Sequence, residues 1–218
     1  MGTTIEIDVT KLNTRDAYRM MIGAIVPRPI AWVSTISSTG TSNLAPFSFF
    51  TGVCINPPTL LFCPTNHPNG KEKDTLRNIR ETREFVVNLV SEELAQQMNQ
   101  SSADYPPEIS EFQEVGLLAT PSHFVKAPRV KESPINFECR LQQIITIGRD
   151  GPGSGHVVLG EIIYAHFAEG IYENGRVAID RVKPIARLDG QNYCPVREVF
   201  AINRPANTRP GKPQPACP

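Results

Sequence analysis

The stretch IAWVSTISSTGTSNLAPFSFFTGV, residues 30–53, decides the expected fold, because β-branched and aromatic residues dominate its apolar part and favour strands. It is predicted to hold strands over residues 30–36 and 44–53. Pro46 interrupts the second strand, since proline has no backbone donor for the ladder. Working outward, the composition predicts further strands over residues 59–63, 85–90, 136–141, 144–147 and 157–167.

The later strands contain two signs of irregular geometry, a break in alternation and an internal glycine. Residues 136–141 alternate apolar and polar side chains, as a half-buried strand does. Gln142 and Gln143 break that alternation, which indicates a β-bulge. Gly160 lies inside the last strand, where a glycine indicates a bend or a close backbone approach. Helices are fewer, and short ones are predicted over residues 74–82, 91–100 and 110–115.

The order of these elements predicts a mainly β protein with minor α content. The chain lacks the regular strand–helix alternation of a parallel doubly wound sheet, so an antiparallel barrel is expected. Residues 1–202 are predicted to form a single domain. Residues 203–218 contain five prolines and almost no apolar side chain, so they are predicted to form an extended or disordered tail.

Charge and composition exclude several classes of function. The chain has 218 residues, with 22 Lys and Arg against 22 Asp and Glu, so its formal net charge is zero. This gives no electrostatic reason to expect nucleic acid or a membrane as partner. The beginning of the chain shows no secretory signal, and a soluble cytoplasmic protein is expected. Five widely spaced cysteines and four scattered histidines form no ligand pattern, so no metal site is expected.

The glycine-rich segment 151–155 superficially resembles a dinucleotide-binding loop. Its third glycine comes one position early, and a strand follows it where that loop requires a helix. The segment is therefore predicted to form the tip of a hairpin.

Three segments have a composition suited to a flat, polar, phosphate-bearing ligand: residues 26–35, 43–50 and 71–79. Small side chains in the first two would let a ring lie close to the backbone. Lysine and threonine at the start of a helix in the third can bind a phosphate. Each segment also has an ordinary interpretation: an edge strand with a proline turn, core packing by phenylalanines, and a solvated helix start.

Taken together, the segments resemble the flavin reductase-like, FMN-binding split-barrel family, and most closely the branch that includes flavoredoxin. The resemblance rests on Pro27–Thr35, Asn43–Phe50, Lys73–Thr75 with Asn78, and Phe85–Asn88, in that order and spacing. Two later stretches, 155–161 and 187–193, are also similar to the family. The resemblance covers residues 16–193.

The resemblance implies an antiparallel, Greek-key-like split β-barrel with a few peripheral helices, a homodimer, and FMN bound near the subunit interface. Arg28 would stabilise the reduced, anionic flavin, and His156 would position a nicotinamide or a flavin substrate, although a local hydrogen bond explains His156 equally well. Lys73, Asp74 and Thr75 would hold the phosphate. The other implied cofactor-binding residues, besides Arg28, are Pro29, Ser34, Thr35, Asn43, Ala45, Pro46, Ser48, Phe49 and Phe50.

The implied activity is an NAD(P)H-dependent oxidoreductase that passes electrons through FMN to a flavin or another acceptor. One alternative is a flavoredoxin-type electron carrier that receives electrons from a protein partner. Further alternatives are a flavin-dependent oxidase or oxygenase and a non-catalytic FMN-binding protein. The sequence leaves the electron donor and acceptor open.

Overall fold

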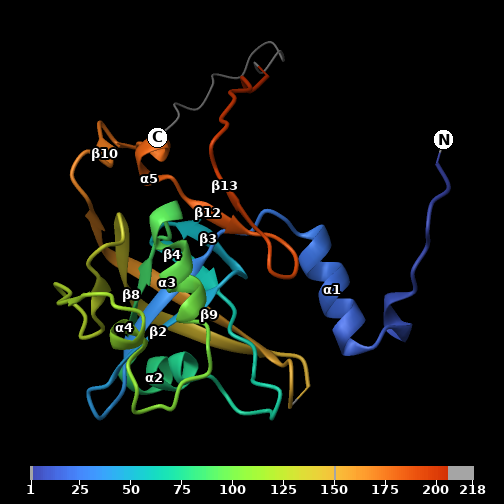
Figure 1. Cartoon of the computed structure of the whole chain (residues 1–218), viewed down its shortest axis with the longest axis horizontal. Helices are drawn as coiled ribbons and strands as arrows, with labels where there is room; N and C mark the ends of the chain where they lie inside the picture. Colours follow the sequence, from blue (N-terminus) through green and yellow to red (C-terminus); the bar gives the residue numbers. More distant parts are fainter. Residues whose placement is uncertain (1, 150, 206–218) are drawn as a thin grey trace.

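The computed structural model describes residues 2–149 and 151–205, and its central element is a seven-stranded antiparallel sheet (Figure 1). The strand order is β2-β1-β5-β8-β9-β4-β3. The strands are β1 (Ala31–Ile36), β2 (Ser42–Phe47), β3 (Phe50–Ile55), β4 (Pro58–Phe62), β5 (Glu84–Asn88), β8 (Ile135–Ile147) and β9 (Gly155–Phe167). The prediction of a mainly β, antiparallel fold is confirmed.

The sheet must curl into a barrel because its two edge strands are consecutive in the chain. β2 and β3 stand at opposite ends of the strand order, yet only Ser48 and Phe49 connect them. We call this point the seam. The prediction of one strand over residues 44–53 is therefore wrong: the chain leaves one sheet edge at Phe47 and joins the other at Phe50. Strand composition alone does not show that the pairing partner changes.

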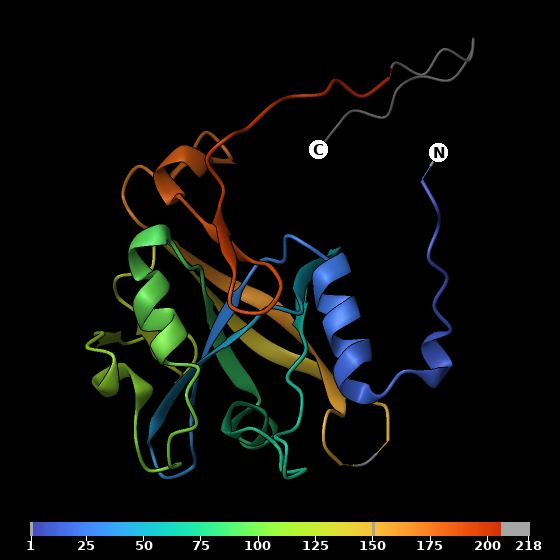
Figure 2. The ribbon, with the colours of Figure 1, turned by 45° about the vertical axis from the view of Figure 1, so that its right-hand side comes forward.

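The inside of the barrel is an apolar core closed at one end by α2 (Asp74–Thr82). Leu76 and Ile79 of this helix join Val33, Phe62 and Phe85 from the strands in the core. In Figures 1 and 2, α2 lies below the strands, across the end of the barrel. The helix occupies the residues predicted from sequence, and its burial brings Thr75 and Asn78 into the interior.

Short helices cover the outer face of β1 and β2. They are η2 (Glu92–Leu94), α3 (Ala95–Gln100) and α4 (Glu111–Glu114). Trp32 packs in this second cluster and donates from its indole Nε1 to Ser101 Oγ over 2.9 Å. The buried Glu111 carboxylate accepts from the Leu44 backbone N–H over 2.8 Å, which satisfies a donor on the edge strand β2.

β8 and β9 form a long hairpin whose details agree with the sequence. Their register shifts between Leu141 and Gln143, so the predicted bulge is confirmed. Residues 151–154 of the glycine-rich segment lie between the two strands, at the predicted hairpin tip, and Gly155 begins β9. A Cβ on Gly160 would collide with the ring of Phe85, which confirms the close approach.

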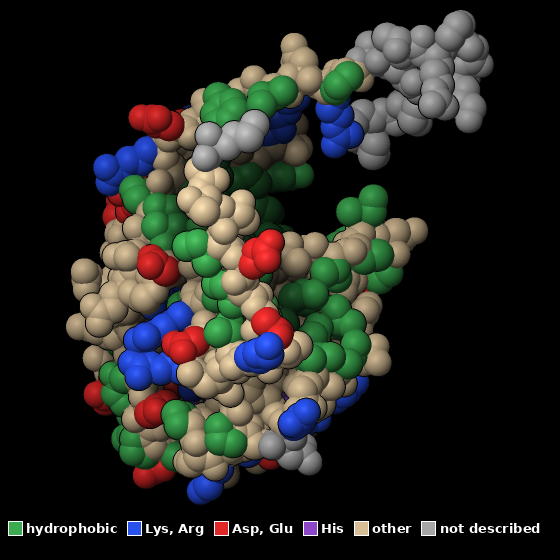
Figure 3. All heavy atoms as spheres, turned by 90° about the vertical axis from the view of Figure 1, so that its right-hand side faces the viewer, with side chains coloured by type: hydrophobic (Ala, Val, Ile, Leu, Met, Phe, Trp, Pro, Cys, Tyr) green, Lys and Arg blue, Asp and Glu red, His purple; other side chains and the backbone are tan. Residues whose placement is uncertain are grey.

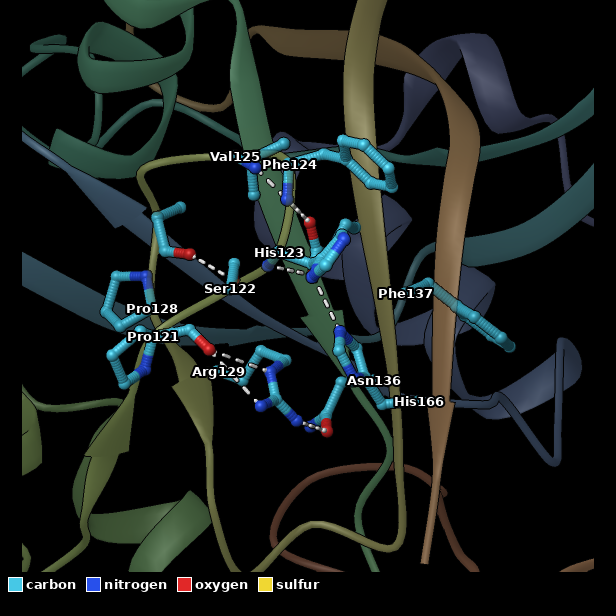
Figure 4. A network of polar contacts seen from close by, with 12 residues as sticks. Pro121, Ser122, His123, Phe124, Val125, Pro128, Arg129, Asn136, Phe137 and His166 are labelled. Carbon is cyan, nitrogen blue, oxygen red and sulfur yellow. Dashed lines mark hydrogen bonds and ion pairs between the residues drawn. The ribbon is translucent and has the colours of Figure 1, made fainter.

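A buried carboxylate holds the loop of residues 121–128 against the outside of this hairpin (Figure 4). Glu138 accepts from the backbone N–H groups of His123, Phe124 and Val125 over 2.6–3.2 Å, and His166 Nε2 lies 2.6 Å away. Burial alone would raise the pKa of Glu138, but these hydrogen bonds outweigh it and lower the pKa. The loop connects β6 (Ala119–Thr120) to β7 (Arg129–Val130).

The described chain before the first helix and after the last strand extends away from the barrel (Figure 1). The N-terminal part holds η1 (Val9–Lys11) and α1 (Thr14–Ala24), which the sequence did not predict, and only Ile22 of α1 is buried. The C-terminal part holds β10 (Tyr172–Glu173), β11 (Arg176–Val177), α5 (Ile179–Val182), β12 (Ile185–Arg187) and β13 (Tyr193–Pro195).

Most of the predicted proline-rich tail, residues 203–218, lies outside the described residues. Among the described residues, no helix is long and apolar enough to cross a membrane.

Candidate functional site

Four buried polar side chains meet where α2 closes the barrel. Thr35 on β1 and Asn43 on β2 are direct cross-strand partners, and Thr75 and Asn78 lie one helical turn apart on α2. Asn78 Nδ2 donates to Thr35 Oγ1 over 3.0 Å, and Asn43 Nδ2 donates to Thr75 Oγ1 over 3.5 Å. The structure thus brings together three of the predicted site residues, Thr35, Asn43 and Thr75.

One acceptor in this cluster has no partner. Asn78 Oδ1 is buried and accepts no hydrogen bond within the described part of the chain. A buried polar atom without a partner costs about 1–3 kcal/mol of stability. The cluster therefore has capacity for one more hydroxyl or N–H donor than the described side chains supply.

Two nitrogen-bearing side chains, Lys73 and His67, lie beside the start of α2. Lys73 Nζ is 3.4 Å from His67 Nδ1, and Asp104 Oδ1 lies 3.6 Å from Lys73 Nζ and 3.4 Å from His67 Nδ1. Asp74, a predicted phosphate residue, instead forms an ion pair with Arg77 Nη1 at 2.7 Å. The backbone N–H groups in the first turn of a helix also favour an anion. This end of α2 has the chemistry of a phosphate site.

Arg28 lies at the other end of the candidate site and is almost fully buried. Its guanidinium donates to the carbonyl oxygens of Ile22, Ile25 and Leu188 over 2.5–2.6 Å, and its Nε faces Ser48 Oγ at 3.5 Å. Burial lowers the pKa of Arg28, yet its ordinary pKa is so far above neutrality that the group stays charged. These partners are neutral carbonyls, so their hydrogen bonds do not neutralise Arg28. The nearby Asp189 carboxylate favours its charged form, and the nearby Arg187 guanidinium opposes it.

Strand β2 and the seam connect the two ends. Ser48, beside Arg28, follows Asn43, beside Thr75, by five positions, which corresponds to roughly 17 Å of extended chain. The predicted site residues along this path are partly exposed: Ala45, Pro46, Ser48, Phe49 and Phe50. Pro29 is exposed. A long ligand lying along β2 could therefore contact both ends.

Ser34 does not join these residues. It lies on the opposite face of β1 from Thr35, fully buried, where its hydroxyl donates to the Pro128 carbonyl over 2.5 Å and accepts from Asn88 Nδ2 over 3.1 Å. These contacts tie β1 to β5 and to the loop before β7. The strict alternation of side chains along a strand separates two residues that are adjacent in sequence.

His156 is also apart from Arg28. Its ring is buried, with Nε2 at 3.0 Å from Asn66 Oδ1 and Nδ1 at 3.1 Å from Thr146 Oγ1. Burial lowers its pKa, so the imidazole is neutral near pH 7. His156 thus connects the β8–β9 hairpin to the chain segment that leads to Lys73, and its predicted contact with a nicotinamide or flavin stays a prediction.

Sequence reasoning missed three residues of this region. Asn78 had a usable signal, since it follows Thr75 by three residues on a predicted helix and so shares its face. His67 and Asp104 are 37 positions apart and meet only through the packing of two loops. No local pattern indicates that contact.

A separate cavity of about 620 Å³ lies between α3 and the β12–β13 pair. Arg187 lines it and stacks over the ring of Tyr193 at 4.6 Å, while Tyr193 Oη donates to Asn99 Oδ1 over 3.1 Å. The backbone of Arg187 also pairs with that of Arg28. The stretch 187–193 therefore forms a cover over Arg28.

Comparisons with known proteins find similar proteins over most of the chain. The family model described as "Flavin reductase like domain" matches residues 22–183. Nitrilotriacetate monooxygenase component B from Bacillus cereus is 34% identical, with a TM-score of 0.89, and the match covers 93% of this chain and 100% of that one. The 2-nitrobenzoate 2-nitroreductase of Pseudomonas fluorescens is 33% identical, with a TM-score of 0.84, and the match covers 95% and 99% of the two chains.

A more distant match bears on the fold alone. Flavoredoxin of Desulfovibrio vulgaris (Miyazaki F) is 22% identical with a TM-score of 0.70, over 82% of this chain and 91% of that one. The resemblance to the split-barrel fold, inferred from sequence, is thereby confirmed.

Proposed function

We propose that this chain, which belongs to the flavin reductase like domain family, binds FMN and transfers electrons from NAD(P)H through it to a flavin or another acceptor. One observation carries the proposal: the anion-binding groups at the start of α2 and the buried, charged guanidinium of Arg28 lie at the two ends of one strand, β2. Two solved relatives above 30% identity are named as a monooxygenase component and a nitroreductase, and both names denote redox proteins.

The residues at the α2 end fit the polar part of FMN. Lys73 and Thr75 would hold the phosphate, since a charged amine, a hydroxyl and free helix N–H groups are the donors that a phosphate requires. The unpartnered Asn78 Oδ1 suits the hydroxyl groups of the ribityl chain, each of which can donate one hydrogen bond. The polar cluster and the cofactor would thus complete each other's hydrogen bonding.

The residues at the seam fit the flat ring. Ala45, Pro46 and Ser48 would meet it mainly through the backbone, Phe49 and Phe50 would pack beside it, and Pro29 would lie close by. FMN supplies the capacity to accept electrons as a pair and release them singly or in pairs. Arg28 would stabilise the negative charge that reduction places on the ring, acting from its fixed position beneath Ser48.

We further propose a homodimer that completes this site. Five of the six residues of the edge strand β3 are exposed, including Val53 and Ile55. An exposed apolar edge strand is normally covered in a native protein. Figure 3 shows the side of the molecule on which the N-terminal segment and α1 lie. Apolar side chains are exposed along this segment, on α1 and just after it: Ile5, Ile7, Val9, Tyr18, Met20, Met21, Ile25 and Val26. A two-fold pair of chains would bury these surfaces together.

An absorbance spectrum of the purified protein, followed by anaerobic addition of NADH and then NADPH, tests the proposal. A yellow protein that bleaches rapidly with either nucleotide is the expected result and identifies the donor. A yellow protein that stays oxidised would contradict the NAD(P)H-dependent activity and favour an electron carrier reduced by a protein partner. A colourless protein that cannot be reconstituted with FMN would contradict flavin binding itself.

A further inference from the structure

The contact between Asp104, His67 and Lys73 differs from the other ion pairs around α2. Glu72 pairs with Arg80 at 3.0 Å, and Asp74 pairs with Arg77 at 2.7 Å, so each joins residues of one local segment. Asp104 comes from the segment after α3, which contains no helix or strand there. A single oxygen of its carboxylate lies within 3.6 Å of both nitrogen atoms.

The exposure of the three side chains is unequal. The Asp104 side chain is 71% exposed, whereas those of His67 and Lys73 are 24% and 31% exposed. The two nitrogen-bearing groups are thus built into the protein surface, and the carboxylate approaches them from the solvent side. An exposed ion pair of this kind contributes little to stability.

We infer that His67 is a second phosphate ligand beside Lys73, and that Asp104 occupies the anion position until the cofactor phosphate displaces it. This inference rests on the proposed function. A phosphate monoester carries up to two negative charges and three acceptor oxygens, so it competes well against one carboxylate for the same donors. When the phosphate is bound, Asp104 must turn away, because two anions cannot share the position.

Titration of the full-length apoprotein with FMN and with riboflavin tests this directly, because the two ligands differ only in the phosphate. Asp104→Asn is expected to tighten FMN binding by about two- to fivefold, the contribution of an exposed ion pair, and to leave the riboflavin Kd unchanged. His67→Gln is expected to weaken FMN binding by about two- to tenfold, again without effect on riboflavin.

Glu173→Gln is the matched control, since Glu173 also forms an exposed ion pair, with Arg181 at 3.1 Å. It should alter neither Kd. If Asp104→Asn shifts both ligands alike, or neither, the inference is overturned. If Asp104→Asn fails to fold, the same question is decided by Asp104→Ser and by the ratio of the FMN and riboflavin Kd values of His67→Gln.

These outcomes are distinct from failure of the proposed function. A wild-type protein that binds neither flavin would contradict FMN binding as a whole. A wild-type protein that binds FMN, with variants that leave the FMN-to-riboflavin ratio unchanged, would contradict only the roles of His67 and Asp104.

Discussion

Lys73 and Thr75 are the side chains on which phosphate binding depends most. We predict that Lys73→Ala with Thr75→Ala sharply reduces the FMN retained after dialysis, since each lost charge-assisted hydrogen bond costs on the order of 1.5–3 kcal/mol. The measurement is the ratio of flavin to protein in the purified variant. Thr120→Ala with Lys131→Ala serves as control, because it also removes one hydroxyl and one amine, but beside β6 and β7. Unchanged flavin content in the first variant would refute the phosphate assignment.

His156 makes the stability of the fold depend on pH. Because burial lowers its pKa in the folded state, the unfolded chain binds a proton more readily than the folded chain. The free energy of unfolding that neutral His156 contributes is therefore fully present above pH ~6.5, and it is lost as the pH falls below that value. Urea unfolding of the wild type and of His156→Gln, above and below this pH, isolates the effect.

The glutamine variant should lose less stability on acidification than the wild type, because its amide does not titrate. An equal loss in both proteins would show that other groups, such as Glu138 with its lowered pKa, account for the whole effect.

At the scale of elements, the close contact between β9 and the core depends on the missing side chain of Gly160. The added methyl group of Gly160→Ala would collide with the ring of Phe85, which is fully buried. We predict a loss of about 1–3 kcal/mol in the free energy of unfolding, typical of an overpacked core. Denaturant titration measures it, and Gly155→Ala on the same strand, where a Cβ meets nothing, should be nearly neutral.

The elements that could be predicted from sequence are those with local signals. Helix 74–82 was predicted at its observed bounds, and the bulge at Gln143 was visible as a break in alternation. The change of strand partner at the seam was not predictable, since Phe47, Ser48, Phe49 and Phe50 suit either edge of a sheet equally well. Long-range pairing decides it.

The candidate site follows the same division. Its anion-binding residues could be proposed because Lys73, Asp74 and Thr75 begin a helix. Strand alternation separates Ser34 from Thr35, but which of the two faces the site depends on the assembled fold. The contact of His67 with Asp104 also depends on the assembled fold, and no local pattern indicates it.

At the scale of the whole molecule, we predict that the dimer depends on β3. Ile55 is 87% exposed in the single chain, so Ile55→Lys should scarcely affect the folding of one subunit. Inside an interface, the same lysine would be an unpaired buried charge, which is strongly destabilising. Light scattering should give the mass of two chains for the wild type and of one chain for the variant, with loss of flavin. Val177→Lys, on β11, is the control.

A wild-type protein that has the mass of one chain and still retains FMN would contradict the dimer. The expected cytoplasmic location stays a prediction.

The two-residue connection at the seam also acts as a tether. Three peptide units join Phe47 to Phe50, so the two sheet edges cannot separate there by more than about 11 Å. No ladder hydrogen bonds join β2 to β3. The covalent connection therefore sets an upper limit on the separation of the two edges, whatever the strength of the contacts between them. Inserting residues between Ser48 and Phe49 would raise this limit, so that the edges of β2 and β3 could move apart for a bulkier ring while every strand pair stays intact.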